Sequence, residues 1–171
     1  MSVVFTVGYE GTDIDRFVGT LQAVGIKRLA DVRALALSRK KGFSKTKLSE
    51  RLSEVGIEYK HYRKLGDPKP GREAARAGKY EEFRRIYNTH LMEEESKESL
   101  RELSEDVQEK ATCMLCFERD PLECHRTIIT KELVGLLGIE VFDLYADSPM
   151  KYVKHASSIP RFHSRESAAA A

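Results

Sequence analysis

Three copies of one junction constrain the fold of this 171-residue chain more than any other feature. In each copy, a stretch with apolar residues at helical spacing ends at a glycine, and an isoleucine begins the next extended run. The junctions are Gly25-Ile26, Gly56-Ile57 and Gly138-Ile139. Glycine just past the end of a helix is the expected left-handed cap. Helices that alternate with strands in this way predict an α/β domain with crossover helices.

The expected sheet is mainly parallel and contains about five strands. They are expected at residues 3–7, 28–32, 59–62, 112–117 and 140–144. The fourth includes Met114-Leu115-Cys116-Phe117, which is apolar on both faces, as a central parallel strand should be. Crossover helices are expected from a cap at Thr12 or Asp13 to Gly25, over residues 44–55 and from about 124 to 137. The fold class is therefore a three-layer α/β domain.

The length of the chain is that of one domain, which we expect over residues 1–148. Residues 66–110, between the third and fourth strands, are highly charged and are expected to form a helical insertion. Within it, residues 66–71 are expected to be a loop, and residues 80–109 to form one or two surface helices. Residues 149–171 have no clear periodicity and are expected to form a basic, partly disordered tail.

The composition excludes several classes of protein. Hydrophobic residues make up 41% of the chain, which is enough for a core, and no apolar run approaches the ~20 residues of a membrane span. The first residues lack the basic and apolar stretches of a signal peptide. Three cysteines, an odd number, argue against a disulfide scaffold. We therefore expect a protein of the reducing cytoplasm.

The formal net charge of +2 hides one basic and one acidic segment. Residues 26–48 contain eight Lys or Arg residues and one acid, whereas residues 93–110 contain eight acids and three bases. The basic segment includes Lys40, Lys41 and Lys45, followed by Lys47, and such clustering is typical of a nucleic-acid contact. The acidic segment is expected to be the solvated face of a helix.

Candidate site residues follow the expected strands, because ligands of parallel α/β sheets bind beyond the carboxyl ends of the strands. The candidates for ligand binding are Gly8, Tyr9, Arg33, Ser38, Arg39 and Arg126, and those for catalysis are Glu118, Cys124 and His125. Three arginines at one edge predict an anion site, to which the first amides of the helix after Cys124 would add. Alternatively, these arginines pair with acids such as Asp31 or Glu118 and only hold loops in place. Gly8 indicates a close approach of the backbone, and Tyr9 either stacks on a ligand or packs within the protein.

Four interpretations are open for the cluster between Cys116 and Arg126. A cysteine nucleophile of the phosphatase or rhodanese-like type is disfavoured, because the sixth residue after Cys116 is Leu122. A metal site is disfavoured as well, because adjacent Cys-His ligands are awkward and no second ligand pair is present, so no metal ligand is predicted. Glu118 and His125 can instead act as acid and base. In the fourth interpretation, the cysteines pack as small apolar residues and His125 caps a helix.

Several short motifs together resemble the family of domain of unknown function 488 (DUF488). They are TVGYEG at residues 6–11, DVR at 31–33, SR at 38–39, GF at 42–43, LG at 65–66, LCFE at 115–118 and CHR at 124–126. The resemblance covers residues 3–147, and it departs from the family at residues 34–37, where a proline is usual. It implies a soluble, mostly prokaryotic α/β protein with no settled activity. It also implies that the candidate residues form one site.

The leading hypothesis is an enzyme, or an enzyme-like domain, that binds a phosphate-bearing ligand at the carboxyl edge of the sheet. A nucleotide or a nucleic acid is the expected ligand, held by Arg33, Arg39 and Arg126 while Glu118 and His125 transfer protons. One alternative is a nucleic-acid-binding module without catalysis, marked by the lysine cluster. Another is thiol redox or sulfur chemistry at Cys124, because a helix N-terminus and a neighbouring histidine favour a thiolate. No motif identifies a cofactor.

Overall fold

The central sheet of the computed structural model, which describes residues 2–166, contains five parallel strands in the order β3-β2-β4-β1-β5. The strands are β1 (Val3–Gly8), β2 (Arg28–Asp31), β3 (Glu58–His61), β4 (Thr112–Cys116) and β5 (Glu140–Tyr145). Strands β1 and β4 are buried along their whole length, as the apolar character of both had indicated. The predicted fold class and the five predicted strands are thus confirmed.

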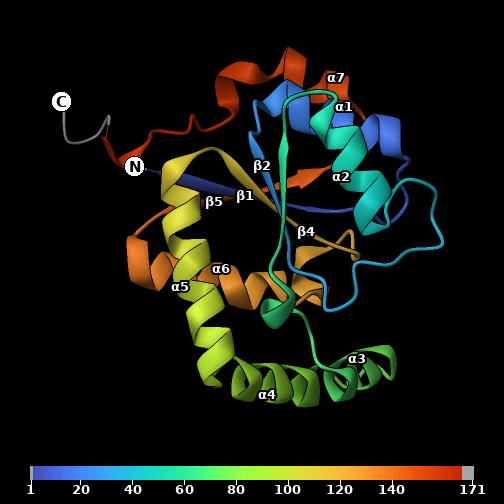
Figure 1. The fold of residues 1–171 in the computed structure, drawn as a ribbon, viewed down its shortest axis with the longest axis vertical. Coiled ribbons are helices and arrows are strands. Elements are labelled where there is room, and N and C mark those ends of the chain that lie inside the picture. Colours follow the sequence, from blue (N-terminus) through green and yellow to red (C-terminus); the bar gives the residue numbers. More distant parts are fainter. Residues whose placement is uncertain (1, 167–171) are drawn as a thin grey trace.

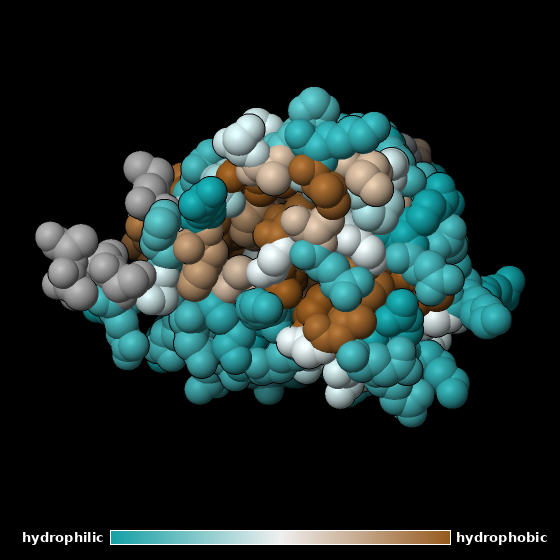
Figure 2. All heavy atoms as spheres, turned by 90° about the horizontal axis from the view of Figure 1, so that it is seen from above, coloured by the Kyte–Doolittle hydropathy of each residue, from teal (hydrophilic) through white to brown (hydrophobic). Residues whose placement is uncertain are grey.

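Helices cover both faces of the sheet (Figure 1). Helices α1 (Ile14–Val24), α2 (Lys45–Ser53) and α7 (Pro149–Lys154) lie on one face, and α5 (Glu94–Glu109) and α6 (Arg126–Leu137) lie on the other. Alternation along β1 divides the core accordingly, because Phe5 and Val7 pack with α1 and α2 while Val4 packs on the opposite side. Seen from the side of α1, α2 and α7, the surface is mostly hydrophilic, with hydrophobic residues gathered in patches (Figure 2).

The three glycine junctions form as the sequence predicted. Gly25, Gly56 and Gly138 have positive φ angles of 82°, 74° and 62°, and each is followed by a buried isoleucine. At the other end of α1, the Asp13 side chain accepts a hydrogen bond from the amide of Arg16 at 2.9 Å. Local signals at both ends of a helix therefore set the direction in which the chain enters each strand.

The insertion between β3 and β4 is helical, as predicted, and its first helix begins earlier than predicted. Helices α3 (Lys69–Arg76) and α4 (Tyr80–Leu91) precede α5, and they extend beyond the layer formed by α5 and α6 (Figure 1). The prediction of a loop over residues 66–71 is wrong from Lys69 onward. Pro70 sits in the first turn of α3, where a missing amide hydrogen breaks no helical hydrogen bond.

The segment after Ser148 is also more ordered than the sequence indicated. It forms α7 and then a 3-10 turn at Ala156–Ser158. The Tyr152 side chain is buried, and its hydroxyl accepts a hydrogen bond from the amide of Tyr145 at 2.7 Å. The predicted tail thus contains a helix and a turn that the sequence did not indicate, and its residues 167–171 lie outside the described residues. Within residues 2–166, the helices are too short or too polar to cross a membrane.

Candidate functional site

A cleft of about 480 Å³ opens at the carboxyl edge of the sheet. Loops after β1, β2 and β4 form one wall, and the insertion forms the other. The residues from the sheet loops are Tyr9, Arg33, Ala34, Leu35, Leu37, Cys116, Phe117, Glu118, Glu123 and His125, and those from the insertion are Asp67, Arg72, Ala75, Arg76 and Tyr80. Ligands of parallel sheets bind at this edge, so the cleft is the candidate functional site.

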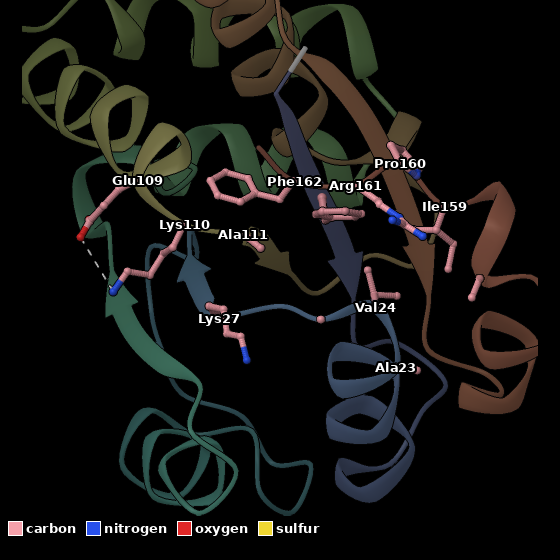
Figure 3. Close-up of a pocket in the computed structure, with 13 residues that line it drawn as sticks. Ala23, Val24, Lys27, Glu109, Lys110, Ala111, Ile159, Pro160, Arg161 and Phe162 are labelled. Carbon is pink, nitrogen blue, oxygen red and sulfur yellow. Dashed lines mark ion pairs between the residues drawn. The ribbon is translucent and has the colours of Figure 1, made fainter. Parts of the chain in front are cut away.

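A second cavity of about 470 Å³ lies at the opposite end of the strands. Lys27 and Ala111, which precede β2 and β4, line it together with the C-terminal segment 159–162 (Figure 3). Its charged residues include Glu109 and Lys110, which pair with each other at 3.9 Å. The amino end of a parallel sheet is not where ligands of this architecture bind, and the cavity adjoins none of the predicted site residues.

Close packing of two loops positions the floor of the cleft. A Cβ atom on Gly8 would lie only 1.7 Å from the carbonyl oxygen of Glu118, so only glycine fits at the end of β1. The amide of Tyr9 donates to the carbonyl of Cys116 at 3.2 Å, and the amide of Glu10 donates to that of Phe117 at 2.8 Å. The predicted close approach at Gly8 is confirmed, and its function is to hold the loop after β4 against β1.

The structure does not bring Arg126 to the cleft wall. Its side chain is fully buried, and its guanidinium donates hydrogen bonds to the carbonyls of Glu118 and Arg119. This arrangement matches the alternative in which an arginine holds a loop in place, although the acceptors are backbone carbonyls rather than a carboxylate. A buried guanidinium with five donors can satisfy several loop carbonyls at once. Arg126 thus fixes the shape of the loop that carries Glu118.

Arg33 does line the cleft, and most of its guanidinium is already engaged. It donates to both carboxylate oxygens of Asp31 at 2.9 and 2.7 Å and to the carbonyl of Phe43 at 2.8 Å. Burial opposes its charge, but the hydrogen bonds and charge of Asp31 raise the pKa of Arg33 above its usual value. Arg33 therefore stays cationic, with its charge largely met by Asp31.

The other predicted ligand contacts occupy different environments. Ser38 and Arg39 are not among the residues that line the cleft, and the Ser38 hydroxyl accepts a hydrogen bond from the amide of Lys40. Tyr9 is 4% exposed and stacks on Phe43 with ring centroids 4.6 Å apart. Phe117, which sequence reasoning had not selected, is 46% exposed and meets the Tyr9 ring edge-on. The aromatic surface offered to a ligand is therefore that of Phe117.

Cys116, Cys124 and His125 converge beneath the cleft. The His125 Nδ1 atom lies 3.7 Å from the sulfur of Cys116 and 3.8 Å from that of Cys124. The Nε2 atom donates to the carbonyl of Val32 at 2.7 Å, so both ring nitrogens have partners within the protein. The Glu118 carboxylate lies 3.2 Å from the Cys116 sulfur. Among these side chains, Cys116, Glu118 and His125 reach the cleft wall.

Burial and mutual charge shift the pKa values of this cluster in opposite directions. Burial opposes ionisation of Cys124, but its hydrogen bond with Cys116 and the charge of His125 lower the pKa of its thiol well below the usual value. Burial also opposes the charge of His125, and the charge of Cys124 raises its pKa to about 9. A hydrogen bond with Cys124, together with burial, raises the pKa of Cys116. Burial, followed by the charge of Cys124, raises the pKa of Glu118 to about 7.

Sequence reasoning missed the residues that the insertion supplies. Arg72 and Arg76 lie four residues apart on α3, so both face the same way, but residues up to 71 had been assigned to a loop. Asp67 is 7% exposed, and its Oδ1 atom has no hydrogen-bond partner among the described residues. The charged repeat of Arg72 and Arg76 at helical spacing was the signal that could have revealed this wall.

Comparison with known proteins gives one match. The family model described as domain of unknown function DUF488 matches residues 13–133, which run from the cap of α1 to the buried part of α6. The matched span includes the whole insertion and the cluster at Cys116, Cys124 and His125. The curated proteins and the solved structures give no match.

Proposed function

The chain belongs to the DUF488 family, and from this premise and the geometry of the cleft we propose that it is an enzyme acting on a phosphate-bearing ligand, a nucleotide or a nucleic acid. The observation that carries the proposal is the meeting of three arginines, Arg33, Arg72 and Arg76, with the carboxyl group of Glu118 in one cleft. One guanidinium group can donate two parallel hydrogen bonds to the oxygens of a phosphate, and a carboxyl group beside it can transfer a proton.

The arginines of α3 are the proposed phosphate contacts. Arg76 is exposed, and Arg72 donates to the backbone carbonyl of Asp67 at 2.6 Å, which fixes its direction. Arg33 already pairs with Asp31, so it supports the site more than it supplies free charge. The cleft also holds the carboxyl groups of Asp67, Glu118 and Glu123. Because Glu123 is exposed and Asp67 is buried against α3, the guanidinium groups of α3 are the charged groups best placed for an anion.

An apolar surface beside the arginines favours a nucleotide over a bare anion. Leu35, Leu37 and Phe117 line the cleft, and they are 57%, 74% and 46% exposed. An inorganic phosphate needs no such surface, whereas a base stacks on an aromatic ring and gains about 1–3 kcal/mol. The exposed Phe117 ring therefore supports a ligand that carries both a phosphate group and a planar ring.

Ligand binding is tested by fluorescence anisotropy with a labelled nucleotide and short labelled DNA and RNA, at several salt concentrations. The Arg72→Ala/Arg76→Ala variant is expected to weaken binding at least about tenfold, because it removes charge-assisted hydrogen bonds. The matched control is Lys131→Ala/Lys154→Ala, which removes two exposed cations on α6 and α7. Equal binding by the two double variants, or no binding by the wild type at low salt, contradicts the proposal.

Catalysis is tested at Glu118. A panel of nucleotides and oligonucleotides is incubated with the protein, and the products are separated by chromatography. The Glu118→Gln variant keeps the shape of the side chain but cannot take up or release a proton, so it is expected to bind the ligand and lose turnover. Turnover that survives this substitution would contradict the proposed proton transfer.

A nucleic-acid-binding module without catalysis is the second candidate. It is favoured by the exposed side chains of Lys41, Lys45 and Lys47, which lie on the loop and helix that follow Leu35 and Leu37 of the cleft. If this candidate holds, a Lys41→Ala/Lys45→Ala/Lys47→Ala variant binds oligonucleotides more weakly. The slope of log affinity against log salt becomes shallower by roughly 0.7–0.9 for each phosphate that the variant no longer neutralises. No member of the panel is then turned over.

A further inference from the structure

We propose that Cys116, Cys124 and His125 bind one Zn²⁺ ion through three protein ligands, with the fourth coordination position open toward the cleft. The three ligand atoms all lie within 4.8 Å of one another, and all three side chains are buried. Two thiolates and an imidazole form a ligand set that binds Zn²⁺ in preference to Mg²⁺ or Ca²⁺, which take oxygen ligands.

The two distances from the imidazole nitrogen to the sulfur atoms fit a tetrahedral ion. Zn–S bonds near 2.3 Å and Zn–N bonds near 2.0–2.1 Å place sulfur and nitrogen ligands about 3.6 Å apart in a tetrahedron. The Nδ1 atom of His125 lies 3.7 Å from the sulfur of Cys116 and 3.8 Å from that of Cys124. Both nitrogen–sulfur distances therefore lie within a few tenths of an ångström of the tetrahedral value, and all three ligand atoms lie within 4.8 Å of one another.

Adjacent cysteine and histidine ligands are geometrically awkward in general, but the backbone at the start of α6 allows them here. Cys124 is extended, with φ −129° and ψ 147°, whereas His125 is helical, with φ −62° and ψ −18°. This change of backbone conformation lets two consecutive side chains face the same point. Cys116 approaches that point from the end of β4, so two separate elements fix the cluster.

Contacts outside the cluster orient its ligands as in established metal sites. The Nε2 atom of His125 donates to the carbonyl of Val32 at 2.7 Å, which leaves Nδ1 directed at the two sulfurs. Metal-binding histidines almost always donate their second nitrogen in this way. The amide of Arg126 lies 3.5 Å from the Cys124 sulfur, a distance that suits a weak hydrogen bond to a thiolate.

The open position follows from which side chains reach the cleft. Cys116 and His125 line the cleft wall, and the carboxylate of Glu118 lies 3.2 Å from the Cys116 sulfur on the same side. Three protein ligands and one position that water or a ligand can occupy are typical of catalytic rather than structural zinc. Zinc binding here requires no cleft ligand, so it can be measured without one.

The first experiment titrates the reduced, chelator-treated protein with Zn²⁺ and with Co²⁺. One equivalent of Zn²⁺ is expected to bind with a dissociation constant below the micromolar range. Co²⁺ is expected to give the near-ultraviolet thiolate charge-transfer bands and the strong visible bands of a four-coordinate site. This spectrum is recorded on the wild type, so it does not depend on the folding of any variant. Weaker Zn²⁺ binding, or Co²⁺ bound without thiolate bands, overturns the proposal.

The second experiment compares cysteine variants. Cys116→Ser and Cys124→Ser are each expected to weaken Zn²⁺ binding by about 100-fold or more, because even the loss of an outer hydrogen-bond partner costs 10–100-fold. The matched control is Cys113→Ala, which removes the buried third thiol of the same strand. Circular dichroism confirms that each variant is folded. If Cys113→Ala weakens binding as much as the two serine variants do, the ion lies elsewhere and the assignment fails.

A third comparison separates this proposal from the function of the cleft. The Arg72→Ala/Arg76→Ala variant is expected to bind Zn²⁺ as the wild type does, because neither arginine belongs to the cluster. Loss of nucleotide binding with Zn²⁺ binding intact supports both assignments independently. Loss of Zn²⁺ binding in this variant contradicts the metal site as placed here.

Discussion

At the scale of single residues, the contact between Gly71 and Asp67 makes a sharp prediction. A Cβ atom on Gly71 would lie 2.1 Å from the Oδ1 atom of Asp67. We expect Gly71→Ala to destabilise the protein by about 1–3 kcal/mol, because the buried carboxyl group must move. Gly135→Ala in α6 is the matched control, since nothing lies within 4 Å of its added methyl group, and it is expected to stabilise by about 0.5–1 kcal/mol. Urea denaturation checks both, and equal effects would contradict this packing.

The same aspartate makes stability depend on pH. Burial raises the pKa of Asp67 to about 6, against 3.8 for the exposed group, although the charges of His125 and Arg72 act in the opposite direction. The folded state therefore holds this proton more tightly than the unfolded state, and stability falls as pH rises from about 4 to 6. A shift of roughly two units corresponds to about 3 kcal/mol at most.

Asp67→Asn removes this titration, so the variant is expected to lose the decline between these pH values. Urea denaturation of both proteins in the presence of a chelator, at a series of pH values, measures the difference. Identical pH profiles for variant and wild type would show that Asp67 titrates normally.

Single residues also show where sequence reasoning stops. The close approach at Gly8 was predictable, because glycine after a strand has few other uses. The position of Arg126 was not, since a guanidinium satisfies backbone carbonyls as well as phosphates and the sequence does not say which it meets. Tyr9 and Phe117 are equally aromatic, and only the packing of the loops decides which one is exposed.

At the scale of elements, the loop between β4 and α6 depends on one buried arginine. Arg126→Met keeps the volume of the side chain but removes the donors to the carbonyls of Glu118 and Arg119. We expect the free energy of unfolding to fall by about 2–4 kcal/mol, because these carbonyl acceptors lose their partner and the loop becomes less tightly held. Arg119→Ala in the same loop is the control, since its pair with Asp147 is exposed and exposed ion pairs contribute little to stability. Urea denaturation and proteolysis of residues 117–123 report the result, and equal sensitivity of both variants would contradict this role.

The elements that sequence analysis predicted well are those with a continuous apolar run or a strong helical periodicity. Strands β1 and β4 are continuous apolar runs, and the crossover helices have apolar residues at helical spacing, so many residues support each prediction. Helix α3 begins with Lys69, Pro70 and Gly71, so its composition is that of a loop although proline fits the first turn. Helix α7 has six residues, of which Tyr152 is buried, and that is too short for a periodic signal.

At the scale of the whole molecule, a charged cluster connects the insertion to the edge of the sheet. The Asp106 carboxylate on α5 accepts hydrogen bonds from Lys60 on β3 and from the hydroxyl of Tyr62, and it lies 3.5 Å from Arg28 on β2. Burial alone would raise the pKa of Asp106, but these partners lower it below 3.8. The folded state thus favours the ionised carboxylate, and its contribution is complete above about pH 4 and lost as pH falls through the lowered pKa.

Asp106→Asn is therefore expected to destabilise the protein by about 1–3 kcal/mol at neutral pH, because three donors lose a charged acceptor. The difference from the wild type is expected to shrink in acid, where the carboxylate of the wild type is protonated. Thermal unfolding of both proteins at several pH values measures this difference in stability. Glu95→Gln is the control, since its pair with Lys64 is exposed and its loss is expected to leave the melting temperature unchanged. A difference that persists unchanged in acid would show that the charge of Asp106 is not what stabilises the insertion.

The insertion that joins β3 to β4 gives the two walls of the cleft separate origins in the gene. One contiguous stretch encodes Asp67, Arg72, Arg76 and Tyr80, while the sulfur and imidazole groups come from the sheet loops outside it. Recombination or design can therefore exchange one wall without rewriting the other, provided that the packing of Tyr87 on His125 is kept. If the cleft binds a ligand as proposed, a chimaera that carries a foreign segment between β3 and β4 exchanges the arginines of the cleft and keeps the cluster of Cys116, Cys124 and His125. The two halves of the proposed site can then evolve independently.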